Sequence, residues 1–302
     1  MSDYDVTIIG AGPAGLTAGL YCARYGLKTI IIEKGLIGGT VTWANSIQNY
    51  PGFLEINGME LMAKFREQAE KAGAQIELET VSEVKDKGKE KQIILQEKTI
   101  SSKAIIVAVG AKSKWLRVKG EKEFLNKGVH FCATCDGPMY NEKEVIVIGS
   151  DTRAAEEAIY LAGIAKKVTL ISPKKELSAE KAKLEVLKEK KVSIMLGTTV
   201  LGFEGKQMLE TVILKNNGKE IKMPCAGAFI YIGSEPNTEF IKVKKDSEGK
   251  VIANEMMETS VKGIFAAGDC IKKELNQIAT CVGEGAIAAH SAAKFIQEKD
   301  IQ

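Results

Sequence analysis

The chain of 302 residues is long enough for two domains with separate cores, and 45% hydrophobic with 27% charged residues is typical of a globular protein. Its net charge of +3 is too small to indicate nucleic-acid binding, and no stretch approaches the roughly 18 apolar residues of a membrane helix. The first residues carry no basic segment ahead of an apolar run, so we expect no secretory signal and a cytosolic location. Six cysteines in that reducing compartment indicate catalytic, metal-binding or buried thiols.

Residues 5–33 carry the pattern of a dinucleotide-binding turn. A short apolar run at 5–9 ends in Gly-Ala-Gly-Pro-Ala-Gly at 10–15, and a helical pattern and a second buried strand at 29–32 follow. An acidic residue, Glu33, stands about 20 residues beyond the glycines, where the fingerprint requires one. A lone glycine motif is weak evidence, but this full context predicts a bound nucleotide.

Each glycine of this turn has its own predicted role. Gly10 permits the tight turn, Gly12 lets the backbone approach a pyrophosphate, and Gly15 lets the helix lie close to the strand. The helix N-terminus supplies unpaired N–H groups for the phosphates. We expect Glu33 to accept hydrogen bonds from a ribose diol and to repel a 2′-phosphate.

The sequence Cys-Ala-Thr-Cys-Asp at 132–136 predicts a redox-active cysteine pair. Two intervening residues bring the sulfurs of Cys132 and Cys135 within reach of a disulfide, and a helix N-terminus would stabilise a thiolate there. Asp136 adjoins the pair and is placed to donate or accept a proton. The competing interpretation is half of a zinc site, for which His130 is the only other nearby ligand and a second Cys-X-X-Cys is missing.

A second unit of the same kind begins with the apolar run at 145–148, but its turn chemistry is altered. The turn at 149–154 reads Gly-Ser-Asp-Thr-Arg-Ala, and a helix and a strand at 168–171 follow. Asp151 stands where the second glycine belongs, which adds a side chain and a negative charge where a pyrophosphate needs room and donors. We interpret this unit as a Rossmann-like domain retained for its shape, with a working nicotinamide site as the alternative.

The C-terminal part predicts a return to the first domain. Residues 263–269 indicate a buried strand that runs into a Gly268-Asp269 turn, and 283–293 are rich in small helix-forming residues. Such a turn can point the Asp269 carboxylate at the hydroxyl groups of a flavin, although a Gly-Asp pair alone is more often only a turn.

These units predict an α/β protein with two Rossmann-like, three-layer nucleotide-binding domains, the second inserted into the first. The first domain is expected at 1–113 and 239–302 and the inserted one at 114–238, with hinges at 110–114 and 233–238. The inserted segment holds 20 Lys and Arg against 16 Asp and Glu, whereas the remainder holds 22 against 23. This excess is either a solvated face or a surface for an acidic protein partner.

Three motifs, in this order and spacing, resemble the low-molecular-weight, bacterial-type thioredoxin reductases. They are the glycine turn at 10–15, Cys-Ala-Thr-Cys-Asp-Gly at 132–137, and Gly268-Asp269. The resemblance covers essentially the whole chain, and the cysteine motif is its most specific part. It implies a homodimer with FAD in each subunit, thioredoxin as the substrate, and an inserted domain that rotates about its hinges.

The same resemblance assigns roles to individual residues. It gives Cys135 electron exchange with the flavin, Cys132 attack on thioredoxin, and Asp136 proton transfer. The residues that it places at FAD are Gly10, Gly12, Pro13, Ala14, Gly15, Glu33, Lys34, Gly38, Gly39, Asn49, Val81, Gly110, Gly268, Asp269, Gln277 and Ile278.

The departures from the family pattern all concern the electron donor. Where the family has a His-Arg-Arg run that grips the 2′-phosphate of NADPH, this chain has Ser-Pro-Lys-Lys at 172–175, and Ser178 stands where a later Arg belongs. Lysine does not supply the bidentate fork of arginine, so NADPH is not the expected donor. NADH meets the same obstacle at Asp151.

A subgroup of the family lacks nicotinamide sites and is similar to this sequence: the ferredoxin-dependent flavin thioredoxin reductases. This similarity implies that FAD accepts single electrons from an acidic iron–sulfur protein. Two electrons that pass from a ferredoxin near −400 mV to a thioredoxin near −270 mV release about 6 kcal/mol, so the transfer is downhill. The alternatives are NADPH, NADH or a deazaflavin as donor, and a flavin redox sensor whose disulfide switches a binding surface.

Overall fold

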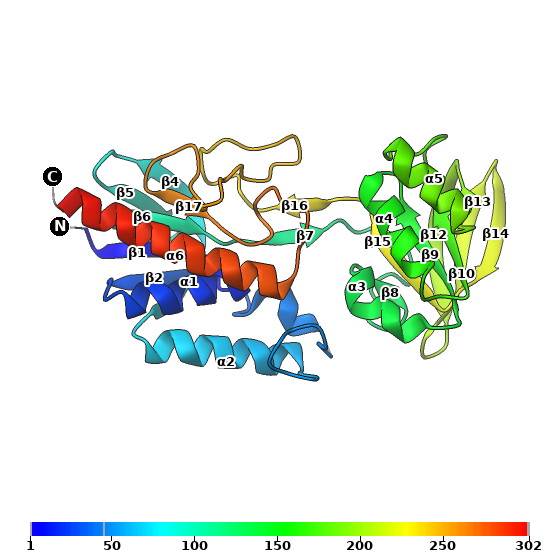
Figure 1. The fold of residues 1–302 in the computed structure, drawn as a ribbon, viewed down its shortest axis with the longest axis horizontal. Coiled ribbons are helices and arrows are strands. Elements are labelled where there is room, and N and C mark those ends of the chain that lie inside the picture. Colours follow the sequence, from blue (N-terminus) through cyan, green and yellow to red (C-terminus); the bar gives the residue numbers. More distant parts are fainter. Residues whose placement is uncertain (1, 45, 301–302) are drawn as a thin grey trace. The chain divides into compact units, whose positions relative to one another are not determined.

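The computed structural model describes residues 2–44 and 46–300, and it divides the chain into two compact units (Figure 1). The first comprises Met1–Lys112 and Glu235–Gln302, and the second comprises Ser113–Ser234. The two connecting segments, β7 (Ala111–Ser113) and β16 (Ser234–Pro236), pair as a two-stranded sheet. The sequence predicted these crossings between residues 113 and 114 and between 238 and 239, whereas the chain passes between the units at 112–113 and at 234–235.

The first unit is built on a seven-stranded sheet in the order β3-β2-β1-β6-β5-β4, with β17 also paired to β6. Strands β1, β2, β3, β6 and β17 pair in parallel, whereas β4, β5 and β6 pair antiparallel. The strands are β1 (Tyr4–Ile9), β2 (Thr29–Glu33), β3 (Gln75–Leu78), β4 (Val81–Asp86), β5 (Lys91–Leu95), β6 (Thr99–Val107) and β17 (Ile264–Ala266).

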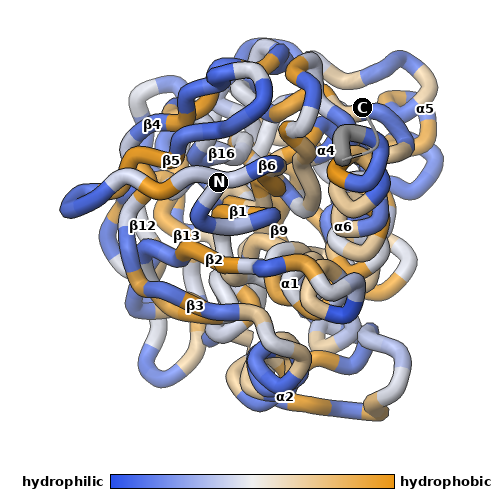
Figure 2. Tube along the Cα trace, turned by 90° about the vertical axis from the view of Figure 1, so that its left-hand side faces the viewer, coloured by the Kyte–Doolittle hydropathy of each residue, from blue (hydrophilic) through white to orange (hydrophobic). Residues whose placement is uncertain are grey.

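The helices of this unit are α1 (Pro13–Arg24), α2 (Gly58–Lys71) and α6 (Ile278–Asp300), with a 3₁₀ turn η1 (Gly39–Trp43). Helices α1 and α6 lie side by side against the sheet (Figure 1). Parallel strands covered on both faces need continuous apolar runs, and 6–9, 29–32 and 104–107 are all buried. Figure 2 shows hydrophobic stretches of this kind along the strands.

The second unit has a parallel five-stranded sheet in the order β11-β10-β9-β15-β8 and an antiparallel three-stranded sheet β12-β13-β14. One core cluster lies between the parallel sheet and the helices, and another lies between that sheet and β12 and β13, which gives three layers. The strands are β8 (Val129–His130), β9 (Glu144–Gly149), β10 (Lys167–Ile171), β11 (Ser193–Met195), β12 (Thr198–Gly205), β13 (Leu209–Asn216), β14 (Lys219–Pro224) and β15 (Gly227–Tyr231).

The helices of the second unit are α3 (Ala133–Asp136), α4 (Thr152–Leu161) and α5 (Lys181–Glu189), with a 3₁₀ turn η2 (Gly137–Tyr140). In both units a helix directly follows a central strand of the parallel sheet: α1 follows β1, and α4 follows β9. The predicted α/β class with Rossmann-like sheets is confirmed. Among the described residues, no helix is both long and apolar enough to cross a membrane.

Helix α6 begins five residues before the predicted helical segment at 283–293. Thr280 Oγ1 accepts a hydrogen bond from the Gln277 backbone N–H at 3.2 Å and donates to the Gln277 carbonyl at 2.9 Å, which organises the first turn. A Cβ on Gly285 would lie 2.3 Å from the Ala14 carbonyl oxygen, so this glycine allows α6 to approach α1.

Gly15→Ala is expected to lower the free energy of unfolding of the apoprotein by about 2 kcal/mol or more. A Cβ at this position would lie 1.8 Å from the Gly10 carbonyl oxygen, and backbone cannot move aside as a flexible side chain can. The control is Gly283→Ala in α6, where a Cβ meets nothing within 4 Å and stability should rise by up to about 1 kcal/mol. Urea titration followed by circular dichroism measures both, and equal effects would contradict the packing role of Gly15.

Candidate active site

The glycine turn after β1 forms an open cradle at the start of α1. Gly10 has φ +106°, and a Cβ on it would lie 2.3 Å from the Ala108 carbonyl oxygen, so only glycine fits. Gly12 is the N-cap of α1, has no side chain to satisfy the first N–H groups, and has open space where its Cβ would stand. Pro13 occupies the first helical turn, where its missing N–H costs nothing. The α1 N-terminus is thus free to bind an anion.

Glu33 lies at the end of β2, beside this cradle. Its Oε2 accepts a hydrogen bond from the Ala11 N–H at 2.7 Å, and its Oε1 accepts one from the Gly35 N–H at 2.8 Å. A carboxylate has about four acceptor positions, so these bonds orient Glu33 and still leave capacity for a diol. A small hollow lies at this edge of the sheet. Four predicted cofactor residues form part of its lining: Gly10, Glu33, Lys34 and Val81.

Two further predicted segments lie against the turn. The Gly38 N–H donates to the Ala11 carbonyl oxygen at 2.7 Å, and a Cβ on Gly39 would lie 3.8 Å from the Gly12 Cα. Asn49 Nδ2 donates to Gln277 Oε1 at 3.1 Å, directly before Ile278 begins α6. Segments far apart in the sequence therefore meet at one edge of the sheet.

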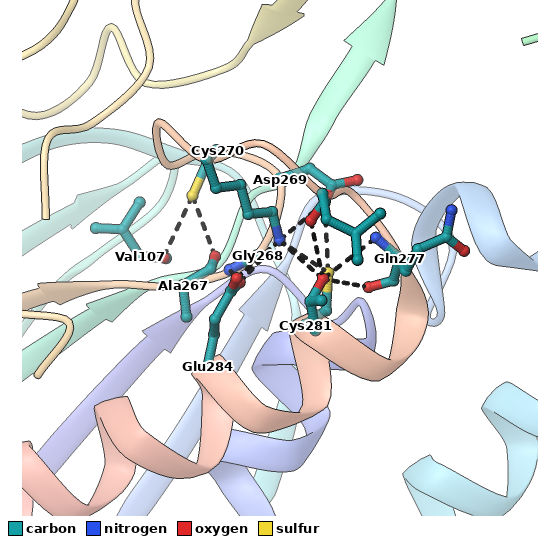
Figure 3. A network of polar contacts seen from close by, with 11 residues as sticks. Val107, Ala267, Gly268, Asp269, Cys270, Gln277, Cys281 and Glu284 are labelled. Atoms are coloured by element: carbon teal, nitrogen blue, oxygen red, sulfur yellow. Dashed lines mark hydrogen bonds and ion pairs between the residues drawn. The ribbon is translucent and has the colours of Figure 1, made fainter. Parts of the chain in front are cut away.

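A partly buried polar network holds the Gly268-Asp269 turn (Figure 3). The Gly268 N–H donates to Glu284 Oε2 at 2.8 Å, and Gly268 has φ +81°. Lys273 Nζ binds Glu284 Oε2 at 2.8 Å and lies 3.3 Å from Asp269 Oδ1, so one lysine neutralises both carboxylates. Gly285 and Gly268 both pack on Ala14. Sequence reasoning missed Lys273, whose spacing of four residues from Asp269 was the only signal.

The remaining predicted residue, Gly110, has φ +61° and open space around its missing Cβ, just after β6. All the predicted cofactor residues thus lie in the first unit, at or near the carboxyl ends of its parallel strands, where open α/β sheets bind ligands. The open α1 N-terminus fits a pyrophosphate, Glu33 fits a ribose diol, and Asp269 fits polyol hydroxyl groups. The residues present therefore fit FAD.

Cys132 and Cys135 are joined by a disulfide bond, with their Cα atoms 5.3 Å apart. Cys132 is the N-cap of the short helix α3; its side chain is half-buried, and Cys135 is exposed. The Ala133 N–H donates to the Tyr231 hydroxyl at 2.6 Å, which fixes α3 on the parallel sheet. Asp136 Oδ2 lies 3.1 Å from His130 Nδ1. Within the described part of the chain, no group of three or more His, Cys, Asp or Glu is placed to hold a metal.

The turn of the second Rossmann-like unit is closed by its own side chains. Asp151 is the N-cap of α4, and its Oδ1 accepts a hydrogen bond from the Ala154 N–H at 2.9 Å. The segment after β10 covers the turn, since the Ser178 N–H donates to the Ser150 carbonyl oxygen at 2.7 Å and Ser178 bridges to Asp151. Lys174 Nζ contacts Ser178 Oγ at 3.1 Å. The Asp151 carboxylate thus accepts one of the N–H groups at the α4 N-terminus that a pyrophosphate would use.

The other four cysteines are buried. Burial raises the pKa of the Cys22, Cys225 and Cys270 thiols to about 12, against an ordinary value of about 8.5. Burial and, secondarily, the charge of Asp269 raise the pKa of Cys281 as well. These four thiols are protonated at neutral pH, and protonated thiols are poor nucleophiles.

Comparison with known proteins matches most of the chain to one family. Residues 4–285 match the family described as pyridine nucleotide-disulphide oxidoreductase. The sequence is 40% identical over 303 residues to a thioredoxin reductase of Bacillus subtilis, covering 98% of this chain and 95% of that one. A crystal structure of thioredoxin reductase from Streptococcus pyogenes is 36% identical with a TM-score of 0.92, and covers 98% of both chains. Thioredoxin reductase from Giardia duodenalis is 32% identical with a TM-score of 0.93, over 97% of this chain and 99% of that one.

Gly12→Ala is expected to weaken FAD binding about tenfold or more, which is about 1.4 kcal/mol. Its methyl group would occupy the open space over the α1 N-terminus, where the backbone must approach the phosphates. Titration of the apoprotein with FAD, followed by flavin fluorescence, measures the change. The apoprotein itself should unfold within about 1 kcal/mol of wild type, because the methyl group meets no protein atom. Unchanged FAD affinity would contradict this assignment of the cradle.

Proposed function

Because this chain belongs to the thioredoxin reductases of the pyridine nucleotide-disulphide oxidoreductase family, we propose that it reduces thioredoxin through Cys132 and Cys135 with electrons from reduced ferredoxin. Its cofactor is FAD, held by the cradle of the first unit. When bound, FAD supplies a carrier that accepts electrons singly or in pairs and delivers a pair to a disulfide.

The thiol chemistry follows from the two cysteines and their neighbour. In the reduced protein the Cys132 thiolate attacks the disulfide of thioredoxin and forms a mixed disulfide, while one thioredoxin sulfur leaves and takes a proton. Cys135 then attacks the Cys132 sulfur, which restores the 132–135 disulfide and releases the second thioredoxin sulfur. Asp136 accepts the proton of Cys135 and returns it to that leaving sulfur. Counted from the Cys132 thiolate, the net result is one disulfide reduced for one formed, with one proton taken up from solvent by the first leaving sulfur.

The closed second turn is the observation that carries the choice of donor. A nicotinamide dinucleotide needs free N–H groups at the α4 N-terminus, and the Asp151 carboxylate already accepts one of them. The pyrophosphate would also have to displace the Ser178–Ser150 backbone bond and approach a negative charge. A protein donor that reaches the flavin by electron transfer needs none of these contacts.

The charge of the second unit suits an acidic protein donor. Its basic excess includes the exposed lysines of the 174–191 segment. Lys183 is tied to Glu156 Oε1 at 2.8 Å, whereas Lys181 and Lys188 are exposed on α5. Charges of this kind steer an acidic partner and raise its association rate at low salt.

One observation favours a nicotinamide donor instead. The family match runs through the second unit without interruption, and that unit keeps the parallel sheet of a nucleotide-binding domain. This second candidate requires α4 to exchange its internal cap for a phosphate and the 172–180 segment to move aside. Because of these two rearrangements, we rank a nicotinamide donor below ferredoxin.

We further propose a homodimer, a cytosolic location, and rotation of the second unit about its two connecting segments, as the family resemblance implies. The positive φ of Gly110 (+61°) and Gly233 (+104°) beside these segments supports a hinge there, since such positions tolerate backbone change. Tyr21, Tyr25 and Ile287 are large side chains that remain exposed on the adjacent helices α1 and α6, and they offer apolar surface for a second subunit.

We expect reduced ferredoxin to bleach the flavin of the anaerobic protein within seconds and NADPH or NADH at about 1 mM to do so at least about 100-fold more slowly, because the second turn is occupied. Stopped-flow absorbance of the oxidised flavin measures all three reactions. Oxidised thioredoxin, added afterwards, should restore the flavin absorbance.

The control is protein bleached with dithionite, which shows whether thioredoxin exchange works independently of the donor. Rapid bleaching by NADPH or NADH would reject the ferredoxin assignment and would leave the family assignment intact. Failure of thioredoxin to reoxidise the dithionite-reduced protein would reject the substrate.

A further inference from the structure

His130 lies directly beneath the redox pair and takes part in no step described above. It ends strand β8, and only 2% of its surface is exposed. Its ring stacks on Phe229 of β15, with centroids 5.3 Å apart and planes inclined by 27°. Nε2 lies 2.6 Å from the Tyr140 hydroxyl, and Nδ1 lies 3.1 Å from Asp136 Oδ2. A buried imidazole thus bridges a phenol and the carboxylate that follows Cys135.

Residues of β15 form a fitted site around the His130 and Tyr140 rings, which we call the seat of His130. A Cβ on Gly227 would lie 2.6 Å from the Tyr140 ring, so glycine at that position makes room for the tyrosine. Tyr140 also meets Phe229 edge to face at 5.5 Å. Gly227 and Phe229, both on β15, therefore hold the Tyr140 and His130 rings in one geometry.

The Tyr140 hydroxyl lies against one ring nitrogen of His130 and the Asp136 carboxylate against the other. Burial, together with the nearby charge of Asp136, raises the pKa of Tyr140, so its hydroxyl stays protonated at neutral pH. A carboxylate can only accept a hydrogen bond, so we assign the hydrogen of a neutral imidazole to Nδ1, with the Tyr140 O–H donating to Nε2. A charged imidazolium would also carry a hydrogen on Nδ1, so either form presents a donor to the carboxylate.

The contact between Nδ1 and Asp136 is close but bent. Its 3.1 Å separation is that of an ion pair, yet Nδ1 has no partner with hydrogen-bond angles among the described residues. A buried donor without a partner is costly, and contacts that act in catalysis are often poorly aligned in a resting protein. The Asp136 side chain is 28% exposed, so a modest rotation of its carboxylate is open to it.

We propose that His130 is a positioning residue that holds the Asp136 carboxylate toward Cys135 during thiol–disulfide exchange. This inference rests on the exchange proposed above. As the Cys135 sulfur attacks the mixed disulfide, its proton passes to Asp136, while the Nδ1–H of His130 keeps that carboxylate in place. The bond between Cys132 and thioredoxin breaks, the 132–135 disulfide forms, and the thioredoxin sulfur takes the proton from Asp136.

Few other titratable groups surround this seat. The Tyr231 hydroxyl binds the Ala133 N–H, and Glu157 and Arg153 of α4 lie beside Tyr231. Burial raises the pKa of Glu157. Lys143 Nζ lies 5.5 Å from the Tyr140 ring centroid, and Cys225 is also near Tyr140. The polar contacts of the His130 ring are instead those with Asp136 and Tyr140.

The test is a single turnover that excludes the electron donor. Protein reduced with dithionite is mixed anaerobically with oxidised thioredoxin or with a small aromatic disulfide, and the 132–135 disulfide is counted by acid quench and alkylation. Asp136→Asn should slow exchange about 100-fold, as loss of a general acid–base group does, and His130→Phe about tenfold. His130→Gln should restore part of the rate, since its amide is a donor.

Two readouts separate positioning from a merely structural role. The double variant His130→Phe/Asp136→Asn should be no slower than Asp136→Asn alone, because His130 acts through that carboxylate. The acidic limb of the pH–rate profile should move to higher pH in His130→Phe, because a donor that favours the ionised carboxylate is lost. Lys143→Met, an exposed neighbour, should match wild type.

Equal rates and pH profiles for His130→Phe and wild type would overturn the inference. So would an equal tenfold loss in the Asp136→Asn background. Should wild type reduce the small disulfide but not thioredoxin, the proposed substrate fails while the comparison of variants with the small disulfide still decides the role of His130. Flavin content and circular dichroism verify that each variant is folded.

Discussion

The N–H groups at the start of two helices are the constraint on which this protein depends. Each helix begins directly after a central strand, and its first donors need acceptors from outside the helix. At α1 the N-cap is Gly12, which offers no acceptor of its own and has open space above it. At α4 the N-cap is Asp151, whose carboxylate binds the Ala154 N–H. Two copies of one fold therefore differ in whether the protein itself caps the first N–H groups of the helix.

This difference gives each unit a separate task. The first unit collects its ligand groups at the carboxyl edge of its sheet, from Glu33 of β2 to the Asp269 turn that Lys273 and Glu284 support. The second keeps the sheet as a rigid support for the cysteines, with α3 fixed through Tyr231 and Asp136 placed over His130. In the proposed scheme the second unit binds no nucleotide and serves to present the disulfide.

Short sequence motifs predicted much of both sites. The glycine turn, Glu33, Asp151 and the cysteine motif are short patterns whose geometry is set within a few residues, and each lies where its pattern indicated. The contacts of Glu284 with the Gly268 N–H and with Lys273 were not readable, because they need α6 to pack against the turn. Nor was the seat of His130, which depends on the pairing of β8 with β15 and on the missing side chain of Gly227. Interactions that arise only from packing leave no spacing to read.

Calorimetric titration of the oxidised holoprotein with NADP⁺ and with NAD⁺ tests the central claim most directly, since the oxidised nucleotides measure occupancy of the second turn without any electron transfer. The account predicts no saturable heat up to about 1 mM of either nucleotide, which corresponds to binding weaker than about −4 kcal/mol. Saturable binding with a Kd in the micromolar range would contradict it, because Asp151 and Ser178 would then have to leave the α4 N-terminus at little cost.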